Sequence, residues 1–190
     1  TAVADFLLTV MRRPDGGLWH RYRHGEAGIT AFLDDYAFLI WGLLELYETT
    51  FTTEYLAAAL ELASYLRRHF FDHEQGGYFQ TSSAGEQVLA RRKELSDGAI
   101  PSGNSSMVLN LLRLARITGD PALQQEAERT SAAFADRIRR SPVNYTQLLS
   151  ALDFAFGPTR EIVVVGRRGD DQTERMLGKV AASFNPRQIA

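Results

Sequence analysis

The chain contains 190 residues, 45% of them hydrophobic and 23% charged, which is the composition of a globular protein rather than a disordered or fibrous one. Its 21 Lys and Arg residues against 23 Asp and Glu give a formal charge of −2, which argues against binding to nucleic acid or to an anionic membrane. The absence of cysteine excludes disulfides, thiolate metal sites and thiol catalysis and fits a cytoplasmic protein, and no apolar stretch approaches the ~20 residues of a membrane span.

Hydrophobic periodicity predicts helices over most of the chain. We expect the chain to open inside a helix, with further sequence before it, because apolar residues at its start follow helical spacing: Val3, Phe6, Leu7, Val10 and Met11. Residues 36–44 and 108–114 are apolar on nearly all sides, which predicts helices buried all round. Each is followed by an amphipathic segment, over residues 55–70 and 123–138, that predicts a helix of an outer layer.

These helix pairs form a repeat. Residues 43–46 align without a gap with residues 111–114, an offset of 111 − 43 = 68. Within each pair the helices are joined by a few residues, whereas successive pairs are joined by long segments, residues 12–33 and 71–102. The long loops should therefore collect at one end of the helices. Both carry paired glycines that predict a turn with an aromatic residue after it: Gly16, Gly17 and Trp19, and Gly76, Gly77, Tyr78 and Phe79.

The pattern changes after Pro158, just beyond a predicted last helix over residues 145–156. The β-branched run of residues 162–165 predicts a strand. An amphipathic segment from Thr173 to Phe184 predicts a helix after it, so the two form one βα unit. We expect the chain to end before a second strand.

The predicted fold class is therefore mainly α. Residues 1–157 are expected to form a partial α/α toroid of helix hairpins, and residues 158–190 the start of a small α/β tail element. The glycines of residues 166–169 lack the third member of a dinucleotide fingerprint, so no cofactor is predicted.

Three segments of the chain, residues 33–40, 93–105 and 160–166, together resemble the C-terminal half of the YyaL-like proteins. That family includes the vertebrate spermatogenesis-associated thioredoxin-domain proteins. The resemblance implies a six-hairpin toroid similar to that of N-acylglucosamine 2-epimerase and of many glycoside hydrolases. It also implies a thioredoxin-like domain before the toroid, which this chain does not contain.

The expected functional site lies where the inner helices begin. Parallel inner helices bring their N-termini and the long loops to one end, where partial positive charge gathers. Asp34 and Asp35 start one inner helix, and Glu94 and Asp97 lie in the loop before the next. Acid–base chemistry on sugars requires a pair of carboxylates that approach one space. We therefore predict Asp35 with Glu94 or Asp97 as the catalytic acid and base.

The same residues have structural readings. An Asp before an apolar helix is more often an N-cap than a catalyst, which favours capping for Asp34 and leaves Asp35 open between the two roles. A charge run such as residues 91–94 is usually a solvated surface, although its position beside Asp97 and Asn104 favours a role at the site. Residues 97–104, rich in small and turn-forming residues, bring backbone close to a ligand or only turn a tight corner.

A set of residues around this mouth is predicted to position the substrate: Arg23, Asp34, Tyr36, Lys93, Ser102 and Asn104. If residues 19–24 are extended, Arg23 shares a face with Trp19, and an arginine beside a stacking aromatic suits a sugar or a carboxylate. His69 and His73 are read as surface residues, so no metal site is predicted.

The predicted function is that of a carbohydrate-active domain, with hydrolase-like acid–base chemistry or sugar binding at the mouth. An epimerase-like reaction is less favoured, because the resemblance implies inner-helix histidines and no predicted inner helix carries one. The alternative is a non-enzymatic helical-repeat module that binds a peptide beside a thioredoxin-like domain. Because a partial ring exposes apolar helix surface at its edges, self-association of this segment is also expected.

Overall fold

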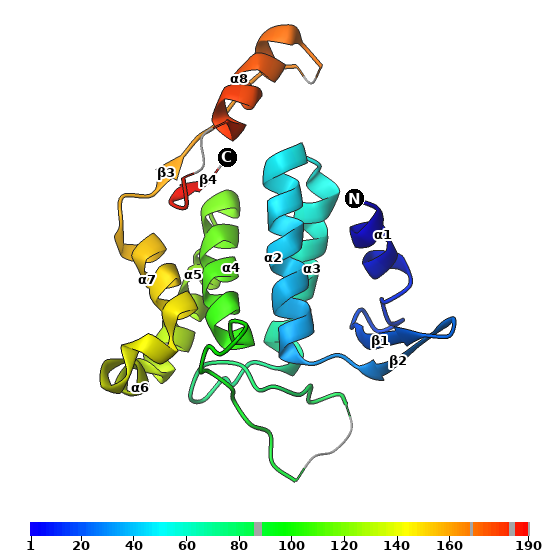
Figure 1. The fold of residues 1–190 in the computed structure, drawn as a ribbon, viewed down its shortest axis with the longest axis vertical. Helices are drawn as coiled ribbons and strands as arrows, with labels where there is room; N and C mark the ends of the chain where they lie inside the picture. Colours follow the sequence, from blue (N-terminus) through cyan, green and yellow to red (C-terminus); the bar gives the residue numbers. More distant parts are fainter. Residues whose placement is uncertain (86–88, 168, 183–184, 190) are drawn as a thin grey trace.

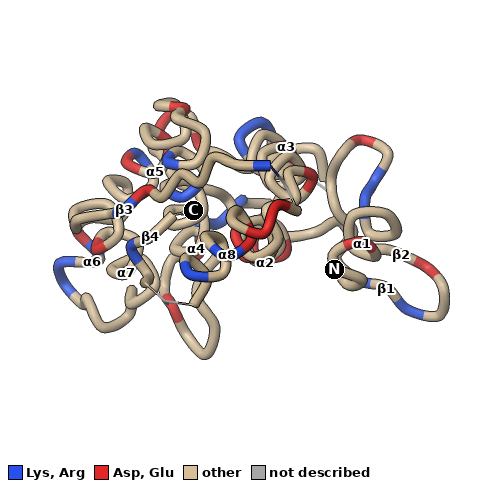
Figure 2. Tube along the Cα trace, turned by 90° about the horizontal axis from the view of Figure 1, so that it is seen from above, with Lys and Arg blue, Asp and Glu red and all other residues tan. Residues whose placement is uncertain are grey.

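The computed structural model describes residues 1–85, 89–167, 169–182 and 185–189, and its helices form two layers (Figure 1). The inner layer is a row of parallel helices: α2 (Leu33–Thr50), α4 (Gly103–Thr118) and α7 (Thr146–Phe156). The outer layer runs in the opposite direction, with one helix packed on α2 and one on α4: α3 (Thr53–His69) and α5 (Pro121–Ala133). Viewed from above, α3 and α5 lie on the same side of α2 and α4 (Figure 2). The predicted partial α/α toroid is confirmed.

The first helix, α1 (Ala2–Thr9), runs in the direction of the outer helices and lies beside α2 (Figure 1). It is followed by an antiparallel hairpin of β1 (Trp19–Arg23) and β2 (Glu26–Thr30). This hairpin and the described parts of the loop 71–102 gather where α2 and α4 begin (Figure 1). The expected loop-rich end is therefore present. None of the described helices is long and apolar enough to cross a membrane.

The expectation that inner helices are buried all round holds for α4 but is wrong for α2. Helix α4 is buried over nearly all its length because α2 and α7 flank it and α5 packs behind it. Helix α2 has α4 on one side and α3 behind. On its other side only part of its surface is covered, so Phe38, Leu39 and Trp41 stay partly exposed and Gly42 is exposed.

The predicted outer helix over residues 123–138 is interrupted. Helix α5 ends at Ala133, and a short helix, α6 (Ala135–Arg140), follows after Phe134. The Phe134 ring packs so closely on Gly77 that a β-carbon added to Gly77 would lie 2.8 Å from the ring. A 3-10 turn, η1 (Pro142–Asn144), then leads into α7.

The C-terminal part forms a small α/β element, in which two details differ from the prediction. The strand is β3 (Arg160–Glu161) rather than residues 162–165, and it pairs in parallel with a second strand, β4 (Gln188–Ile189), that was not expected. Because β4 is so short, the ladder ends with the bond from Ile162 N–H to Ile189 O. The predicted amphipathic helix is α8 (Asp171–Ala181), and Phe184 lies outside the described residues.

Candidate functional site at the loop-rich end

Two turns at the loop-rich end are held in the same way by the inner helices. The Tyr36 hydroxyl accepts a hydrogen bond from Leu18 N–H at 2.8 Å, and Asn104 Oδ1 accepts one from Tyr78 N–H at 2.7 Å. Both donors directly follow a glycine pair, and 36 + 68 = 104, so Tyr36 and Asn104 occupy equivalent positions in the repeat. Both are fully buried. These two predicted substrate contacts therefore fix the loops that shape the mouth.

Asn104 and its neighbours form a buried polar network. Asn104 Nδ2 donates to Tyr78 O at 2.9 Å and to Glu94 O at 2.7 Å, so its amide bonds are occupied on both sides. Ser102 is the N-cap of α4: its Oγ accepts from Ser105 N–H at 3.1 Å and donates to Leu95 O at 2.9 Å. The structure gives Ser102 and Asn104 a role in holding the loop on α4.

Asp97 links the loop to two helices. Its Oδ1 accepts from Ser102 N–H at 2.9 Å, at the start of α4, and its Oδ2 accepts from Gln147 N–H at 2.8 Å, in the first turn of α7. Both N-termini thus direct a backbone donor at one carboxylate, an arrangement that stabilises the helices. Asp97 lies where the sequence placed it, but both of its oxygens are engaged by the backbone.

Lys93 closes the second glycine turn. Its Nζ donates to Asp72 Oδ2 at 2.6 Å and to Gly76 O at 2.7 Å, and it lies 5.0 Å from the centre of the Phe79 ring. Both charged side chains are largely buried, with 14% and 13% of their surface exposed. Lys93 therefore clamps the turn that precedes Tyr78.

The Lys93–Asp72 pair predicts a loss of stability in acid. The Lys93 ammonium and the Gln75 N–H hold the pKa of the Asp72 carboxyl at about 2, below its ordinary 3.8. Above the ordinary pKa the ionised carboxylate adds about 2 kcal/mol to the free energy of unfolding. This contribution is lost as the pH falls through 2. Urea unfolding of Asp72→Asn should show lower stability at pH 7 and a weaker fall in acid; exposed Asp136→Asn is the control. Identical acid profiles for wild type and Asp72→Asn would contradict this.

Asp34 packs on the start of the neighbouring inner helix and does not act as a cap. Its Oδ2 accepts from Gln80 Nε2 at 2.9 Å. Its Oδ1 is buried without a hydrogen-bond partner and lies so close to Gly103 that a β-carbon there would come within 2.4 Å. Asp34 therefore joins α2, α4 and the long loop.

Asp35 instead carries the capping role and also meets a histidine. Its Oδ2 accepts from Phe32 N–H at 2.8 Å, which completes the N-terminal turn of α2. The same oxygen lies 2.8 Å from His20 Nδ1 of strand β1. His20 is 43% exposed and Asp35 29%, so solvent reaches both. The sequence indicated no role for His20, because the pairing joins residues 15 positions apart across a hairpin.

The backbone opposite His20 is strained. Strand pairing sets Trp19 against Thr30 and Arg21 against Gly28, which places Ile29 opposite His20. Ile29 has φ = +64°, in the left-handed region. A β-branched residue there costs about 1–3 kcal/mol, and such strain is concentrated at functional sites.

A groove of about 520 Å³ lies between α1 and α2. Trp19, His20 and Asp35 are among the residues that line it. The rest of the lining is mostly apolar and comes mainly from the two helices: Val3, Leu7, Met11, Phe38, Leu39 and Leu46. The His20–Asp35 pair is thus reached by solvent and adjoins an apolar wall.

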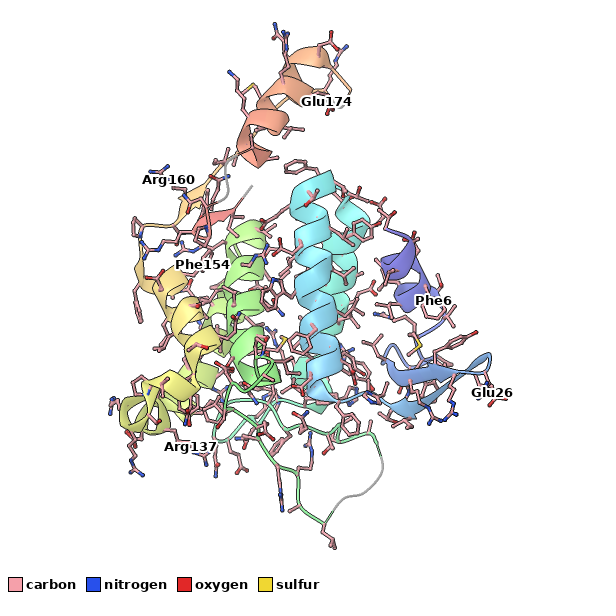
Figure 3. All side chains as sticks on the ribbon, in the orientation of Figure 1. Phe6, Glu26, Arg137, Phe154, Arg160 and Glu174 are labelled. Carbon is pink, nitrogen blue, oxygen red and sulfur yellow. The ribbon has the colours of Figure 1, made fainter. Side chains whose placement is uncertain are left out.

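The other predicted site residues lie apart from this pair. Arg23 pairs with Glu26 at the tip of the β1–β2 hairpin, which projects away from the helices (Figure 3). Arg23 Nε donates to His24 Nε2 at 3.1 Å. Glu94 is exposed at the loop-rich end, and its backbone carbonyl accepts from Asn104. Within the described residues, no three His, Asp or Glu side chains form a metal ligand set.

No family model matches the chain, but curated relatives do. The chain is 34% identical over 167 residues to human spermatogenesis-associated protein 20, a match of 87% of this chain and 21% of that protein. The rat protein is 35% identical over 159 residues, or 83% of this chain and 20% of its own length. The chain is a homologue of spermatogenesis-associated protein 20. It spans about a fifth of the length of these relatives, and the resemblance read from the three sequence segments is confirmed.

Solved structures share the fold. The GH76 alpha-mannanase of Bacteroides thetaiotaomicron matches with a TM-score of 0.56 and 16% identity, over 70% of this chain and 36% of that one. Cellobiose 2-epimerase of Spirochaeta thermophila matches with a TM-score of 0.54 and 18% identity, over 68% of this chain and 34% of that one. Unsaturated glucuronyl hydrolase of Bacillus sp. GL1 matches with a TM-score of 0.51 and 16% identity, over 94% of this chain and 52% of that one. These carbohydrate-active proteins establish that the chain has the architecture of an α/α toroid.

Proposed function

We propose that the loop-rich end binds a sugar and performs acid–base chemistry of the hydrolase type through His20 and Asp35. The observation that carries the proposal is the 2.8 Å contact between His20 Nδ1 and Asp35 Oδ2 at the N-terminus of an inner helix. The toroid fold shared with carbohydrate-active proteins gives the substrate class.

The pair has the geometry of an oriented acid–base group. An ionised carboxylate only accepts hydrogen bonds, so its contact requires the proton of neutral His20 to be on Nδ1. That leaves Nε2 to take a proton from a substrate hydroxyl or to return it. The Phe32 N–H donates to the same Asp35 oxygen and so holds the carboxylate in place. Asp35 thus orients the histidine, and the histidine carries the proton.

This proposal changes which of the predicted carboxylates take part in the acid–base chemistry. Asp97 has both oxygens bonded to backbone N–H groups, which suits a scaffold. Glu94 is exposed in the same group of loops and stays a candidate for the second carboxylate. His20 takes the place that we first gave to Asp97, so the proposed acid–base set is His20, Asp35 and Glu94.

A glycan panel tests the proposal. Purified protein should bind or turn over at least one sugar, and His20→Asn should lower the turnover by about 10²-fold or more, the usual contribution of a general acid or base. Asp35→Asn should act in the same direction. His24→Asn, in the turn at the far end of the same hairpin, is the matched control and should keep wild-type turnover. If no glycan binds, or if His20→Asn turns over like wild type, the proposal fails.

Peptide binding is a second candidate function, favoured by the apolar groove between α1 and α2. A peptide with apolar residues every three or four positions would match its aliphatic and aromatic lining. Such a peptide should bind wild type and lose affinity for Leu39→Asp, a residue of the groove wall. Binding that is unchanged by Leu39→Asp would exclude the groove as the site.

A further inference from the structure

A separate cavity of about 340 Å³ lies on the inner layer, away from the loop-rich end. Its helical walls come from the second halves of α2 and α4 and from the end of α7: Trp41, Glu45, Glu48, Leu109, Arg113 and Phe154. Phe154 marks this region in Figure 3. Residues of the C-terminal element close the cavity, among them Val180 and Pro186. Its volume suits a small organic molecule.

Among the described residues that line this cavity, negative charges outnumber positive ones. Arg113 Nη1 lies 2.7 Å from Glu45 Oε1, and Arg113 Nη2 lies 3.1 Å from Glu48 Oε1. Trp41 Nε1 donates to the same Glu45 oxygen at 3.1 Å. Two carboxylates therefore share one guanidinium, which leaves an excess of one negative charge in the described lining.

The surroundings of Glu48 make that charge costly. Its side chain is 20% exposed, and its Oε1 is buried beside Arg113 Nη2. Burial raises the pKa of Glu48, and the Arg113 charge only partly opposes this. Glu45 is 59% exposed, so a solute in the cavity can reach its carboxylate. A further positive charge would favour the ionised form of both groups.

The remaining wall is suited to the carbon skeleton of such a cation. Aromatic rings of Trp41, Phe51 and Phe154 line the cavity beside Leu109. Apolar walls lower the local dielectric constant, which strengthens the attraction between a ligand cation and the carboxylates. Aromatic faces also attract organic cations.

We propose that this cavity binds a small molecule that carries a protonated amine, with the ammonium beside Glu45 and Glu48 and the carbon skeleton against Trp41 and Phe154. The site is independent of the His20–Asp35 pair. A neutral sugar bears hydroxyls and no net charge, so it does not meet the requirement of this cavity for a cation.

Cyclohexylamine and cyclohexanol form a matched pair of probes, because they differ in the charged group and share the ring. Titration of 15N-labelled protein at pH 7 should shift the indole N–H signal of Trp41, assigned with Trp19→Phe, for the amine and not for the alcohol. Glu45→Gln should weaken amine binding by about tenfold or more, a change of about 1.4 kcal/mol. Glu128→Gln, an exposed change on α5, and His20→Asn should bind like wild type.

Glu48→Gln serves as a second variant if Glu45→Gln unfolds, since it removes the other carboxylate of the pair. Equal shifts with amine and alcohol, or no shift with either, would overturn the proposal. So would full amine affinity in a folded Glu45→Gln variant. A lower melting temperature of Glu45→Gln without any binding by wild type would show that the ion pair only joins two hairpins, which also overturns it.

Discussion

Asn104→Ala is expected to lower the free energy of unfolding by about 3 kcal/mol, because it leaves buried backbone groups without partners. Asn104 is fully buried and makes three hydrogen bonds, with Tyr78 N–H, Tyr78 O and Glu94 O. Water cannot replace these bonds without opening the second glycine turn. Urea unfolding followed by far-UV circular dichroism measures the change.

Two further variants serve as comparisons for Asn104→Ala. Asn144→Ala removes the same side chain from an exposed position and should change stability by less than about 0.5 kcal/mol. Tyr36→Phe removes one hydrogen bond, that to Leu18 N–H, at the equivalent repeat position, and should cost about 1 kcal/mol. If Asn104→Ala proved as stable as Asn144→Ala, the network between loop and helix would not exist in solution.

The hairpin array is predictable from the sequence because its helices follow simple periodicity and recur after 68 residues. The same offset joins Glu45 to Arg113 by an ion pair, which shows that equivalent positions of adjacent inner helices face each other. Periodicity does not show which element packs on each side of a helix. Helix α2 reads as apolar all round, yet the face with Phe38 and Gly42 is only partly covered.

The candidate site was harder to predict, since its contacts are not local. The sequence placed Asp34, Asp35 and Asp97 correctly at the loop-rich end but could not tell which donors they meet. Asp97 bonds to Gln147, 50 positions away, and Asp34 to Gln80, 46 positions away. The equivalence of positions 36 and 104 was present in the repeat and would have indicated that Tyr36 and Asn104 share a structural role.

The predicted position of the strand in the C-terminal element was wrong for a different reason. A run of β-branched residues predicts an extended segment, but a strand also needs a partner of matching length. Val163 and Val165 are 83% and 92% exposed, because β4 supplies only two residues to pair with. Propensity alone therefore placed the strand two residues too late.

Glu126→Ala is expected to lower the free energy of unfolding by about 3 kcal/mol, because it breaks a buried charged network. Glu126, on α5, is 5% exposed. It accepts a hydrogen bond from the Tyr78 hydroxyl and pairs with Arg67 of α3. Its removal leaves the fully buried Tyr78 hydroxyl without a partner and an uncompensated Arg67. Urea unfolding measures the loss, and exposed Glu128→Ala on the same helix should stay within about 0.5 kcal/mol of wild type.

The effect of Glu126→Ala should reach the loop-rich end, since Tyr78 follows the glycine pair that Asn104 holds. Amide hydrogen exchange at Tyr78 and Phe79 should therefore become faster in Glu126→Ala, whereas exchange at Leu18 in the first glycine turn should not change. Glu126→Gln, which keeps an acceptor for the Tyr78 hydroxyl but loses the charge that faces Arg67, should lie between wild type and Glu126→Ala. Faster exchange at Leu18 to the same extent would mean that the two turns unfold as one unit, and that the outer-layer network does not support the second turn selectively.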